Sequence, residues 1–418
     1  MSIAEKIRKI AQDARQASLV MAQLSSDVKN RMLLKMAAAL EAGTQHLIDE
    51  NHKDLEAGRQ KGLSVAMLDR LMLDEKRIGG IAGALREIAA LDDPVGEVTR
   101  MRKRPNELMV GKMRIPLGTI GIIYESRPNV TADAAALCLK AGNAVILRGG
   151  SEAINSNLAI AEVLQTVLKE MEIPLAALFL IPFTEREGVL EMLKQEDSID
   201  LIIPRGGESL IRFVVENSRI PVIKHYKGVC HIFVDQSADF DKAERIIVNS
   251  KTQRPGVCNA LETLLIHREI ADEFIPRIAA TLSALGVELR GDDAFCSRAP
   301  TAIPATEEDW HAEYLELILA CRVVDDLDVA IAHINRYCSL HTESIITSDY
   351  SRAQRFIREV NSSCVLVNAS TRFADGGQLG LGAEIGISTT KLHSFGPMGL
   401  EDLTTTKFIV YGDGQVRE

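Results

Sequence analysis

The chain has 418 residues, is 46% hydrophobic and carries a formal net charge of -10 at pH 7. At roughly 150 residues per domain, this length predicts two or three domains in an ordinary globular protein. The acidic balance argues against nucleic-acid binding as the main task, and no apolar run approaches the ~18 residues of a membrane-spanning helix.

Seven cysteines are scattered along the chain with no Cys-x-x-Cys pair, which suits a reducing compartment and excludes a zinc ribbon. Residues 1–23 mix charges of both signs with apolar residues at helical spacing, so they predict an amphipathic helix and not a secretory signal. We therefore expect a cytoplasmic protein that binds neither nucleic acid nor a membrane.

The first part of the chain, up to about residue 92, is rich in Ala, Leu and Met at helical spacing and predicts a block of helices. Residues 97–114 change character and predict two strands around Arg104-Pro105-Asn106. A hairpin alone is marginal in water, so we expect it to pack against another part of the molecule or another subunit.

From Leu117 onward, short apolar runs alternate with helical patterns, which predicts βαβ units and a parallel sheet. The expected strands are 119–124, 144–147, 178–181, 201–203 and 221–224, and the expected helices are 129–141, 151–169, 187–194 and 208–217. A second α/β region follows, with strands expected at 232–235, 261–266, 317–324, 344–347 and 365–367, an exposed loop at 291–309, and a last strand at 403–411.

Cys258 lies in the sequence SKTQRPGVCNALET, between a predicted helix and a buried strand. Lys251 and Arg254 precede it, and Pro255-Gly256 breaks the chain just before it. A loop thiol beside positive charge favours the thiolate, which is the nucleophilic form. Most cysteines of reduced proteins are small buried hydrophobes instead, which is our interpretation of Cys138, Cys321 and Cys364.

Two expected strand ends carry the same Arg-Gly-Gly pattern before a helix, at Arg148-Gly149-Gly150-Ser151 and at Arg205-Gly206-Gly207-Glu208. Glycine lets the backbone approach a ligand, and ligands of open α/β sheets bind outside the carboxyl ends of the strands. A tight turn without a ligand explains the same pattern. Asn129 likewise begins a predicted helix, where a simple N-cap is one explanation.

Several stretches together make the chain resemble the aldehyde dehydrogenase superfamily and, within it, the γ-glutamyl phosphate reductase family. They are residues 121–130 (GIIYESRPNV), 251–258, 310–315 (WHAEYL), 324–345 and 391–401 (KLHSFGPMGLE). The resemblance covers essentially the whole chain. It implies an α/β fold with a Rossmann-type cofactor domain (1–96 and 115–227), an α/β catalytic domain (228–385), and a small β oligomerisation element (97–114 and 403–413).

The activity that the resemblance implies is reduction of L-glutamyl 5-phosphate to L-glutamate 5-semialdehyde, a step of proline biosynthesis. Cys258 is the implied nucleophile, which forms a thioester, and NADPH is the implied cofactor. Asn129 aligns with the superfamily's oxyanion-stabilising Asn, Arg148 with a Lys that contacts the cofactor ribose, and Glu313 with a Glu that holds the nicotinamide ribose.

The residues expected to bind the cofactor are therefore Arg148, Gly149, Ser151, Gly206, Gly207 and Glu313. Those expected to bind the substrate are Arg127, Lys251 and Arg254. We expect no metal site, because no third ligand is suitably spaced from His333 and His341. The implied partners are the small-molecule substrate, glutamate 5-kinase as the source of the acyl phosphate, and further copies of the chain in a homo-oligomer.

Hydrolytic members of the superfamily carry a Glu-Leu-Gly-Gly-Lys stretch whose Glu activates water. The corresponding residues 224–228 are KHYKG, and His225 falls nearest the vacant position. An enzyme that must reduce its thioester gains nothing from a base that hydrolyses it. Two alternatives stay open: a coenzyme-A-acylating aldehyde dehydrogenase, against which residues 124–130 argue, and an inactive nucleotide-binding scaffold, against which Cys258 and Asn129 argue.

Overall fold

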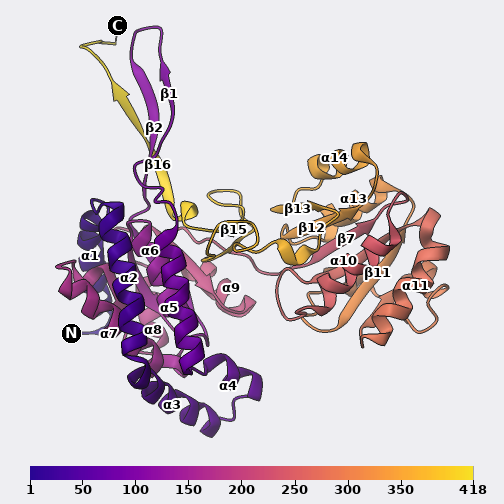
Figure 1. Ribbon diagram of the computed structural model, residues 1–418, viewed down its shortest axis with the longest axis horizontal. Coiled ribbons are helices and arrows are strands. Elements are labelled where there is room, and N and C mark those ends of the chain that lie inside the picture. Colours follow the sequence, from indigo (N-terminus) through magenta and orange to yellow (C-terminus); the bar gives the residue numbers. More distant parts are fainter. Residues whose placement is uncertain (418) are drawn as a thin grey trace. The chain divides into compact units, whose positions relative to one another are not determined.

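The computed structural model describes residues 1–417 and divides them into two compact units, each of which is considered by itself (Figure 1). Unit 1 contains Met1–Lys224, Leu381–Gly386 and Met398–Glu418, and unit 2 contains His225–Gly380 and Ile387–Pro397. The chain passes from unit 1 to unit 2 after Lys224 and returns to unit 1 near its end, whereas the expected domain boundary after residue 227 stays a prediction. Within residues 1–417, no helix combines the length and the apolar character needed to cross a membrane.

Unit 1 begins with a block of helices, as predicted (Figure 1). Four of these helices begin after a residue whose side chain caps the helix, namely Ser2, Ser25, Ser64 or Asp74. The helix α3 has no such side-chain cap. Such caps satisfy the orphan N–H groups of a helix start. The helices are α1 (Ile3–Met21), α2 (Ser26–Ala42), α3 (Thr44–Gln60), α4 (Val65–Leu71) and α5 (Glu75–Ala90).

The sheet of unit 1 is parallel, with the strand order β5-β4-β3-β6. Its strands are β3 (Thr119–Tyr124), β4 (Ala144–Arg148), β5 (Leu178–Leu180) and β6 (Leu201–Arg205). Its helices are α6 (Asn129–Lys140), α7 (Ile154–Glu170), α8 (Arg186–Met192) and α9 (Glu208–Asn217). The predicted strand at 221–224 is wrong: those residues contribute only an isolated bridge between Val222 and Ile202.

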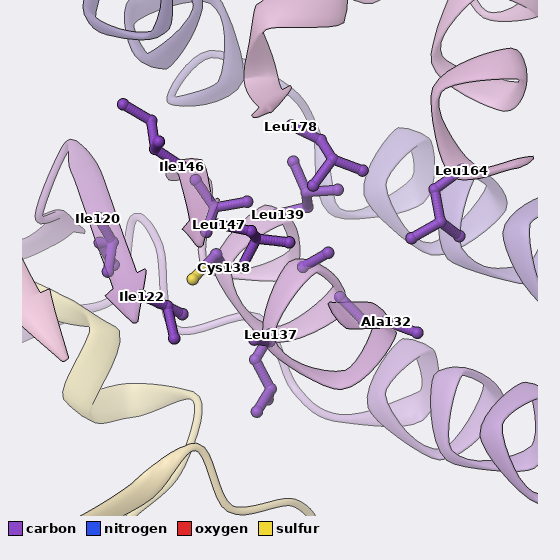
Figure 2. Close-up of a cluster of buried hydrophobic side chains, with 14 of the residues drawn as sticks. Ile120, Ile122, Ala132, Leu137, Cys138, Leu139, Ile146, Leu147, Leu164 and Leu178 are labelled. Carbon is purple, nitrogen blue, oxygen red and sulfur yellow. The ribbon is translucent and has the colours of Figure 1, made fainter. Parts of the chain in front are cut away.

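The core of unit 1 lies between this sheet and its helices, and Figure 2 shows part of it. Ile120, Ile122 and Leu147 on the strands are fully buried, as are Leu137 and Leu139 on α6. Cys138 is buried among them, which confirms it as a core thiol, and burial raises its pKa. The βαβ pattern predicted this layer because each strand is apolar on both faces.

The predicted hairpin joins the last strand in a separate antiparallel sheet of order β1-β2-β16 (Figure 1). Its strands are β1 (Val98–Lys103), β2 (Met109–Pro116) and β16 (Thr404–Tyr411). Apolar side chains of β16 remain in solvent, with Phe408 at 70%, Val410 at 55% and Tyr411 at 63% exposure. An exposed edge strand with such side chains offers a surface for strand pairing or packing.

Unit 2 is built on a seven-stranded parallel sheet of order β10-β9-β11-β8-β7-β12-β13. Its strands are β7 (Cys230–Val234), β8 (Leu261–His267), β9 (Glu288–Gly291), β10 (Ile303–Pro304), β11 (Ile318–Val324), β12 (Thr342–Ile346) and β13 (Cys364–Val367). Its helices are α10 (Phe240–Thr252), α11 (Ala271–Ala284), α12 (Asp293–Cys296), α13 (Leu327–Tyr337) and α14 (Tyr350–Glu359).

The stretch at 291–309 was expected to be a loop, but it contains α12, β10 and the short 3-10 helix η4 (Glu307–His311). Asp292 caps α12, and Asp309 bonds to Thr306 and Arg290, so local polar side chains organise this segment. A short two-stranded sheet pairs β14 (Gly386–Ser388) with β15 (Gly396–Met398).

Candidate active site

Cys258 lies on the turn that connects α10 to β8, as the sequence predicted, and its side chain is half-buried. Its neighbour Asn259 is buried and donates its amide to the carbonyl of Ala374 at 3.0 Å. Cys230, the first residue of β7, donates its thiol to the Cys258 carbonyl at 3.2 Å. The backbone around the candidate nucleophile is therefore anchored, while Cys258 as a residue is only half-buried.

The backbone of Gly228 lies close against this turn. A Cβ atom at Gly228 would lie 1.9 Å from the Cys258 carbonyl oxygen and 2.6 Å from its Cα atom. Gly228 precedes β7 and Cys258 precedes β8, and these strands are parallel neighbours, so the residues before them meet at the same sheet edge. Only glycine lets the two backbones approach this closely.

Glu313 also contacts this glycine. Its Oε1 atom accepts the Gly228 N–H at 2.8 Å. The resemblance predicted a contact between Glu313 and the cofactor, and this stays a prediction. The structure adds that Glu313 holds the backbone of Gly228 in place, and the Cys258 turn packs against this backbone.

Lys251 was expected to lie on the loop before Cys258 and to bind the substrate, and the structure gives it a different setting. It belongs to the last turn of α10, its side chain is fully buried, and its Nζ atom lies 2.7 Å from Oε2 of the equally buried Glu262. Burial lowers the pKa of Lys251 and raises that of Glu262 to about 7, and the attraction between the two opposes both shifts. A charge already paired inside the core supports the turn and does not favour contact with a substrate phosphate.

Two arginines flank the Cys258 turn from different segments of unit 2. Arg254 is exposed on the turn itself, and Arg372 belongs to the 3-10 helix η5 (Thr371–Phe373). The Arg372 Nε atom donates to the Gln253 side chain at 2.8 Å, next to Arg254. Burial and then the charge of Arg254 lower the pKa of Arg372, whereas Asp375 and Cys258 act in the opposite direction.

The position of Arg372 depends on hydrogen bonds that join η5 to the end of α10. Ser250 and Ser370 share a bond of 2.9 Å, and the Thr371 N–H donates to Ser250 at 3.2 Å. Sequence analysis missed Arg372 because more than a hundred residues separate it from the turn. The Ser370-Thr371 pair beside it is the only local signal, and it indicates a capped turn, not a site.

Three glutamates near the turn are engaged by other residues. Glu262 pairs with Lys251, Glu313 accepts from Gly228, and Glu343 accepts from His231 at 2.9 Å. Glu262 and Glu343 are also fully buried. Such groups are poorly placed to activate water.

His225, the residue that falls nearest the missing base in the sequence, belongs to unit 2. His225 lies edge-on to His341, with ring centroids 5.9 Å apart. Burial lowers the pKa of His341 to about 3, so this ring is neutral at physiological pH. Among residues 1–417, no cluster of His, Cys, Asp and Glu has the arrangement of a metal site.

Unit 1 contains a cavity of about 900 Å³ at the carboxyl ends of β3, β4 and β5, which is where the sheet topology predicts a ligand. Arg148 and Ser151 line it, together with two further cations, Lys61 and Arg186. Arg148 donates to the Thr184 carbonyl at 2.7 Å, and its Nε atom is buried without a partner in the described residues. The volume is in the range of a cofactor site.

The glycine turns contribute to this cavity less directly than expected. Gly150 lines it, whereas Gly149, Gly206 and Gly207 are not among its described wall residues. A Cβ atom at Gly149 would meet Asn157 at 2.2 Å, so this glycine serves packing. Gly207 gives its N–H to Glu125 at 3.0 Å, so that donor is already engaged. The cofactor contacts predicted for these three glycines stay predictions.

Asn129 is the first residue of α6, and the N-cap position belongs to Pro128, so the N-cap explanation for Asn129 does not hold. Its amide donates instead to Asp133 Oδ2 at 2.9 Å. The preceding loop is fixed by Glu152, which accepts both the N–H and the hydroxyl of Ser126, at 2.7 and 2.6 Å. Arg127 is exposed on this loop, and its predicted substrate contact stays a prediction.

Asn129 and Asp133 also line a second cavity of unit 1, of about 340 Å³. Asn129 belongs to unit 1 and Cys258 to unit 2, so their expected partnership stays a prediction.

Similarity to known proteins identifies the family of this chain. Residues 1–296 match the model of the aldehyde dehydrogenase family. The chain is similar to the γ-glutamyl phosphate reductase of Geotalea daltonii, with 76% identity over 418 residues and 100% coverage of both chains. It is similar to the crystal structure of γ-glutamyl phosphate reductase from Thermotoga maritima, with a TM-score of 0.97, 47% identity, and coverage of 99% of this chain and 100% of that chain.

A more distant likeness concerns the fold alone. An acetylating aldehyde dehydrogenase from Geobacillus thermoglucosidasius has 16% identity and a TM-score of 0.71, and the match covers 100% of this chain and 98% of that chain. Together these findings confirm the predicted fold class.

Proposed function

The chain belongs to the aldehyde dehydrogenase family and, within it, to the γ-glutamyl phosphate reductases, and on this premise we propose that it reduces L-glutamyl 5-phosphate to L-glutamate 5-semialdehyde. The observation that carries the proposal is the anchored, half-buried Cys258 turn with two arginines beside it. A thiol needs access and positive charge to act as a thiolate nucleophile, and this turn supplies both.

Cys258 begins the reaction by attack of its thiolate on the acyl carbon of the substrate. The carbon–oxygen bond to phosphate breaks, phosphate leaves, and a thioester remains on Cys258. Bound NADPH supplies the hydride that reduces this thioester. The resulting thiohemiacetal expels the Cys258 thiolate, and the semialdehyde is released.

Asn129 is the proposed donor to the oxyanion that forms at the acyl carbon, with the Cys258 N–H as the second donor. Its side-chain amide is oriented by Asp133, which accepts one of its two N–H bonds and leaves the other available. Preorganised donors of this kind stabilise the charge that develops in the transition state.

Arg254 and Arg372 are the proposed partners of the phosphate group. Arginine recognises phosphate through paired N–H donors, and two guanidinium groups beside each other repel until an anion lies between them. Burial lowers the pKa of Arg372 most, and the charge of Arg254 lowers it further, which is the effect that this repulsion predicts. These two replace the buried Lys251 as the preferred phosphate ligands.

NADPH is the proposed cofactor, and the cavity of unit 1 at the carboxyl ends of the strands is its proposed site. Lys61, Arg148 and Arg186 give this cavity three cations, which suits the additional phosphate that distinguishes NADPH from NADH. Ser151, at the start of the short 3-10 helix η1 (Ser151–Ala153), adds a hydroxyl donor. Glu313 keeps its predicted role at the nicotinamide ribose as part of this proposal.

Homo-oligomerisation through the β1-β2-β16 sheet also belongs to the proposal. Exposed Phe408, Val410 and Tyr411 on an edge strand support it, because such a surface is unfavourable in a monomer.

The test is to follow absorbance at the nicotinamide band while the enzyme oxidises L-glutamate 5-semialdehyde in the presence of phosphate and NADP+. We expect phosphate-dependent NADPH formation, and we expect Cys258→Ser to fold but to lose nearly all turnover, since a hydroxyl is a weaker nucleophile. More than a few per cent of activity in Cys258→Ser would contradict the role of the thiol. Turnover that requires coenzyme A in place of phosphate would favour the acylating alternative.

A further inference from the structure

The second cavity of unit 1 combines charges of both signs around the proposed oxyanion donor. It has a volume of about 340 Å³ and is lined by Asn129 and Asp133 of α6, Arg70 of α4, and Arg77 of α5. Apolar residues of α5, among them Ile81 and Ala84, complete the wall. A concave site with a few convergent polar groups is the usual form of a small-molecule site.

Asp133 is the acidic group of this cavity, and its hydrogen bonding is incomplete. Oδ2 accepts the Asn129 amide at 2.9 Å, whereas Oδ1 is buried and has no hydrogen-bond partner in the described residues. Burial raises the pKa of Asp133 to about 6, and the Asn129 bond and the charge of Arg205 oppose that shift. A buried carboxylate oxygen without a partner is unfavourable unless a cation or donor approaches it.

The two arginines of the cavity differ in what they already bind. Arg77 is engaged at the end of α4, where it donates to the carbonyl of Met72 at 3.0 Å and to the Asp69 carboxylate at 2.7 Å. Arg70 is exposed and makes no hydrogen bond or ion pair with any other residue of the described chain. Arg70 is therefore the cation that is available to an incoming anion.

We propose that this cavity recognises the amino-acid head of the substrate, with Asp133 binding its α-ammonium group and Arg70 its α-carboxylate. The inference rests on the function proposed above and deepens it, because it identifies what makes the enzyme specific for a glutamyl group.

The chemistry of the substrate matches the charges of the cavity. An α-amino acid head carries one ammonium and one carboxylate on the same carbon, and the cavity offers one unpartnered carboxylate oxygen and one unpartnered guanidinium. In a glutamyl group this carbon is three carbon–carbon bonds of ~1.5 Å from the acyl carbon. The Asn129 amide is proposed to bind the oxyanion at the acyl carbon. Asn129 lies on the same cavity wall, one helical turn from Asp133.

The simpler explanation is that Asp133 only orients Asn129. The two roles make different predictions. Orientation of Asn129 affects the kcat/KM of every aldehyde equally, whereas binding of the ammonium group affects only the kcat/KM of substrates that carry an amine. Three aldehydes separate them: L-glutamate 5-semialdehyde, 5-oxopentanoate, which lacks the amine, and 4-aminobutanal, which lacks the carboxylate.

The experiment measures kcat/KM for the three aldehydes with phosphate and NADP+, in the wild type, Asp133→Asn, Arg70→Gln and the control Arg8→Gln. Arg8 is an exposed residue of α1 outside both cavities. We expect Asp133→Asn to reduce the preference for glutamate semialdehyde over 5-oxopentanoate by roughly 10- to 100-fold, the value of hydrogen bonds to charged groups. Arg70→Gln should reduce the preference for glutamate semialdehyde over 4-aminobutanal by a similar factor. Arg8→Gln should change neither preference.

The pH dependence gives a further readout. Asp133 meets Asn129 on its own helix, Arg205 on β6, and Arg70 and Arg77 across the cavity. Since the carboxyl group protonates as the pH falls through about 6, the preference for the amine-bearing substrate should weaken below that pH. The preference over 4-aminobutanal, which depends on Arg70, should persist there.

Binding of L-glutamate and of glutarate, measured by calorimetry, tests the cavity without any turnover. We expect the wild type to bind L-glutamate more tightly, and Asp133→Asn to bind the two ligands alike. An equal loss of kcat/KM for all three aldehydes in Asp133→Asn, or an unchanged preference for L-glutamate in the binding assay, would overturn the inference while the proposed function stands. Absence of phosphate-dependent NADP+ reduction in the wild type would instead count against the proposed function.

Discussion

Replacing Gly228 by alanine is the smallest change that should disable the active site without touching a reacting group. The added methyl carbon would lie 1.9 Å from the Cys258 carbonyl oxygen, 2.5 Å from its carbonyl carbon and 2.6 Å from its Cα atom. All three atoms belong to the backbone, so no side-chain rotation relieves the contact. The turn that carries the nucleophile has to move.

The size of the movement sets the size of the effect. A carbon–oxygen contact is comfortable near 3.3 Å, so the Cys258 backbone has to retreat by more than about 1 Å. A misplacement of about 1 Å costs on the order of 100-fold in rate when reacting atoms are held in a near-attack geometry. Overpacking of this kind also destabilises a fold by ~1–3 kcal/mol.

The assay compares Gly228→Ala with Gly79→Ala in NADPH formation and in thermal denaturation. Gly79 is an exposed residue inside α5, and a Cβ atom there meets nothing within 4 Å. Alanine is favoured over glycine in a helix by ~1 kcal/mol, so the control should be fully active and no less stable. Gly228→Ala should remain folded with kcat reduced by about 100-fold.

A Gly228→Ala enzyme with kcat within about twofold of the wild type would refute the reasoning. It would mean that the Cys258 turn tolerates displacement, and that its anchoring by Cys230 and Asn259 does not matter for catalysis.

Other substitutions test separate parts of the proposal. Asn129→Ala should lower kcat by roughly 100-fold or more with little change in thermal stability, whereas loss of stability at unaltered kcat would indicate a structural role. Arg372→Gln should raise the KM for phosphate by about 10-fold, and Arg245→Gln, which removes an exposed arginine of α10, should leave that KM unchanged. Arg186→Gln should lower kcat/KM for NADP+ by about 10-fold and leave that for NAD+ unchanged; an equal loss with both cofactors would exclude contact with the additional phosphate.

Much of this architecture follows directly from sequence patterns. Strand–helix alternation with fully apolar strands identified both parallel sheets, and the Pro255-Gly256 break placed Cys258 on a turn before a strand. Residues 221–224 were mistaken for a strand because their apolar pattern is that of a strand, although only Val222 makes a bridge. The stretch at 291–309 was mistaken for a loop because its order comes from capping by Asp292 and Asp309, which periodicity does not detect.

The parts of the site that escaped prediction depend on contacts between distant segments. Lys251 was predicted to be a loop cation that binds the substrate, and only the fold shows that Glu262, on the next strand, pairs with it in the core. The sequence around Arg372 and Gly228 carries no local signal of a functional site, since their importance comes from which segment the fold places beside Cys258. Asp133 looked like an ordinary helix residue until its position one turn from Asn129 placed both on a cavity.

The most direct test of the central claim, that an acyl group on Cys258 is exchanged with phosphate and not with water, is a rapid-mixing measurement in phosphate-free buffer. Enzyme is mixed with L-glutamate 5-semialdehyde and excess NADP+, and NADPH absorbance is followed before and after phosphate is added. We predict a burst of about one NADPH per active Cys258, then no further turnover until phosphate restores it, because the nearby Glu262 and Glu343 are buried and paired. Steady NADPH formation without phosphate, with free glutamate released, would contradict the account.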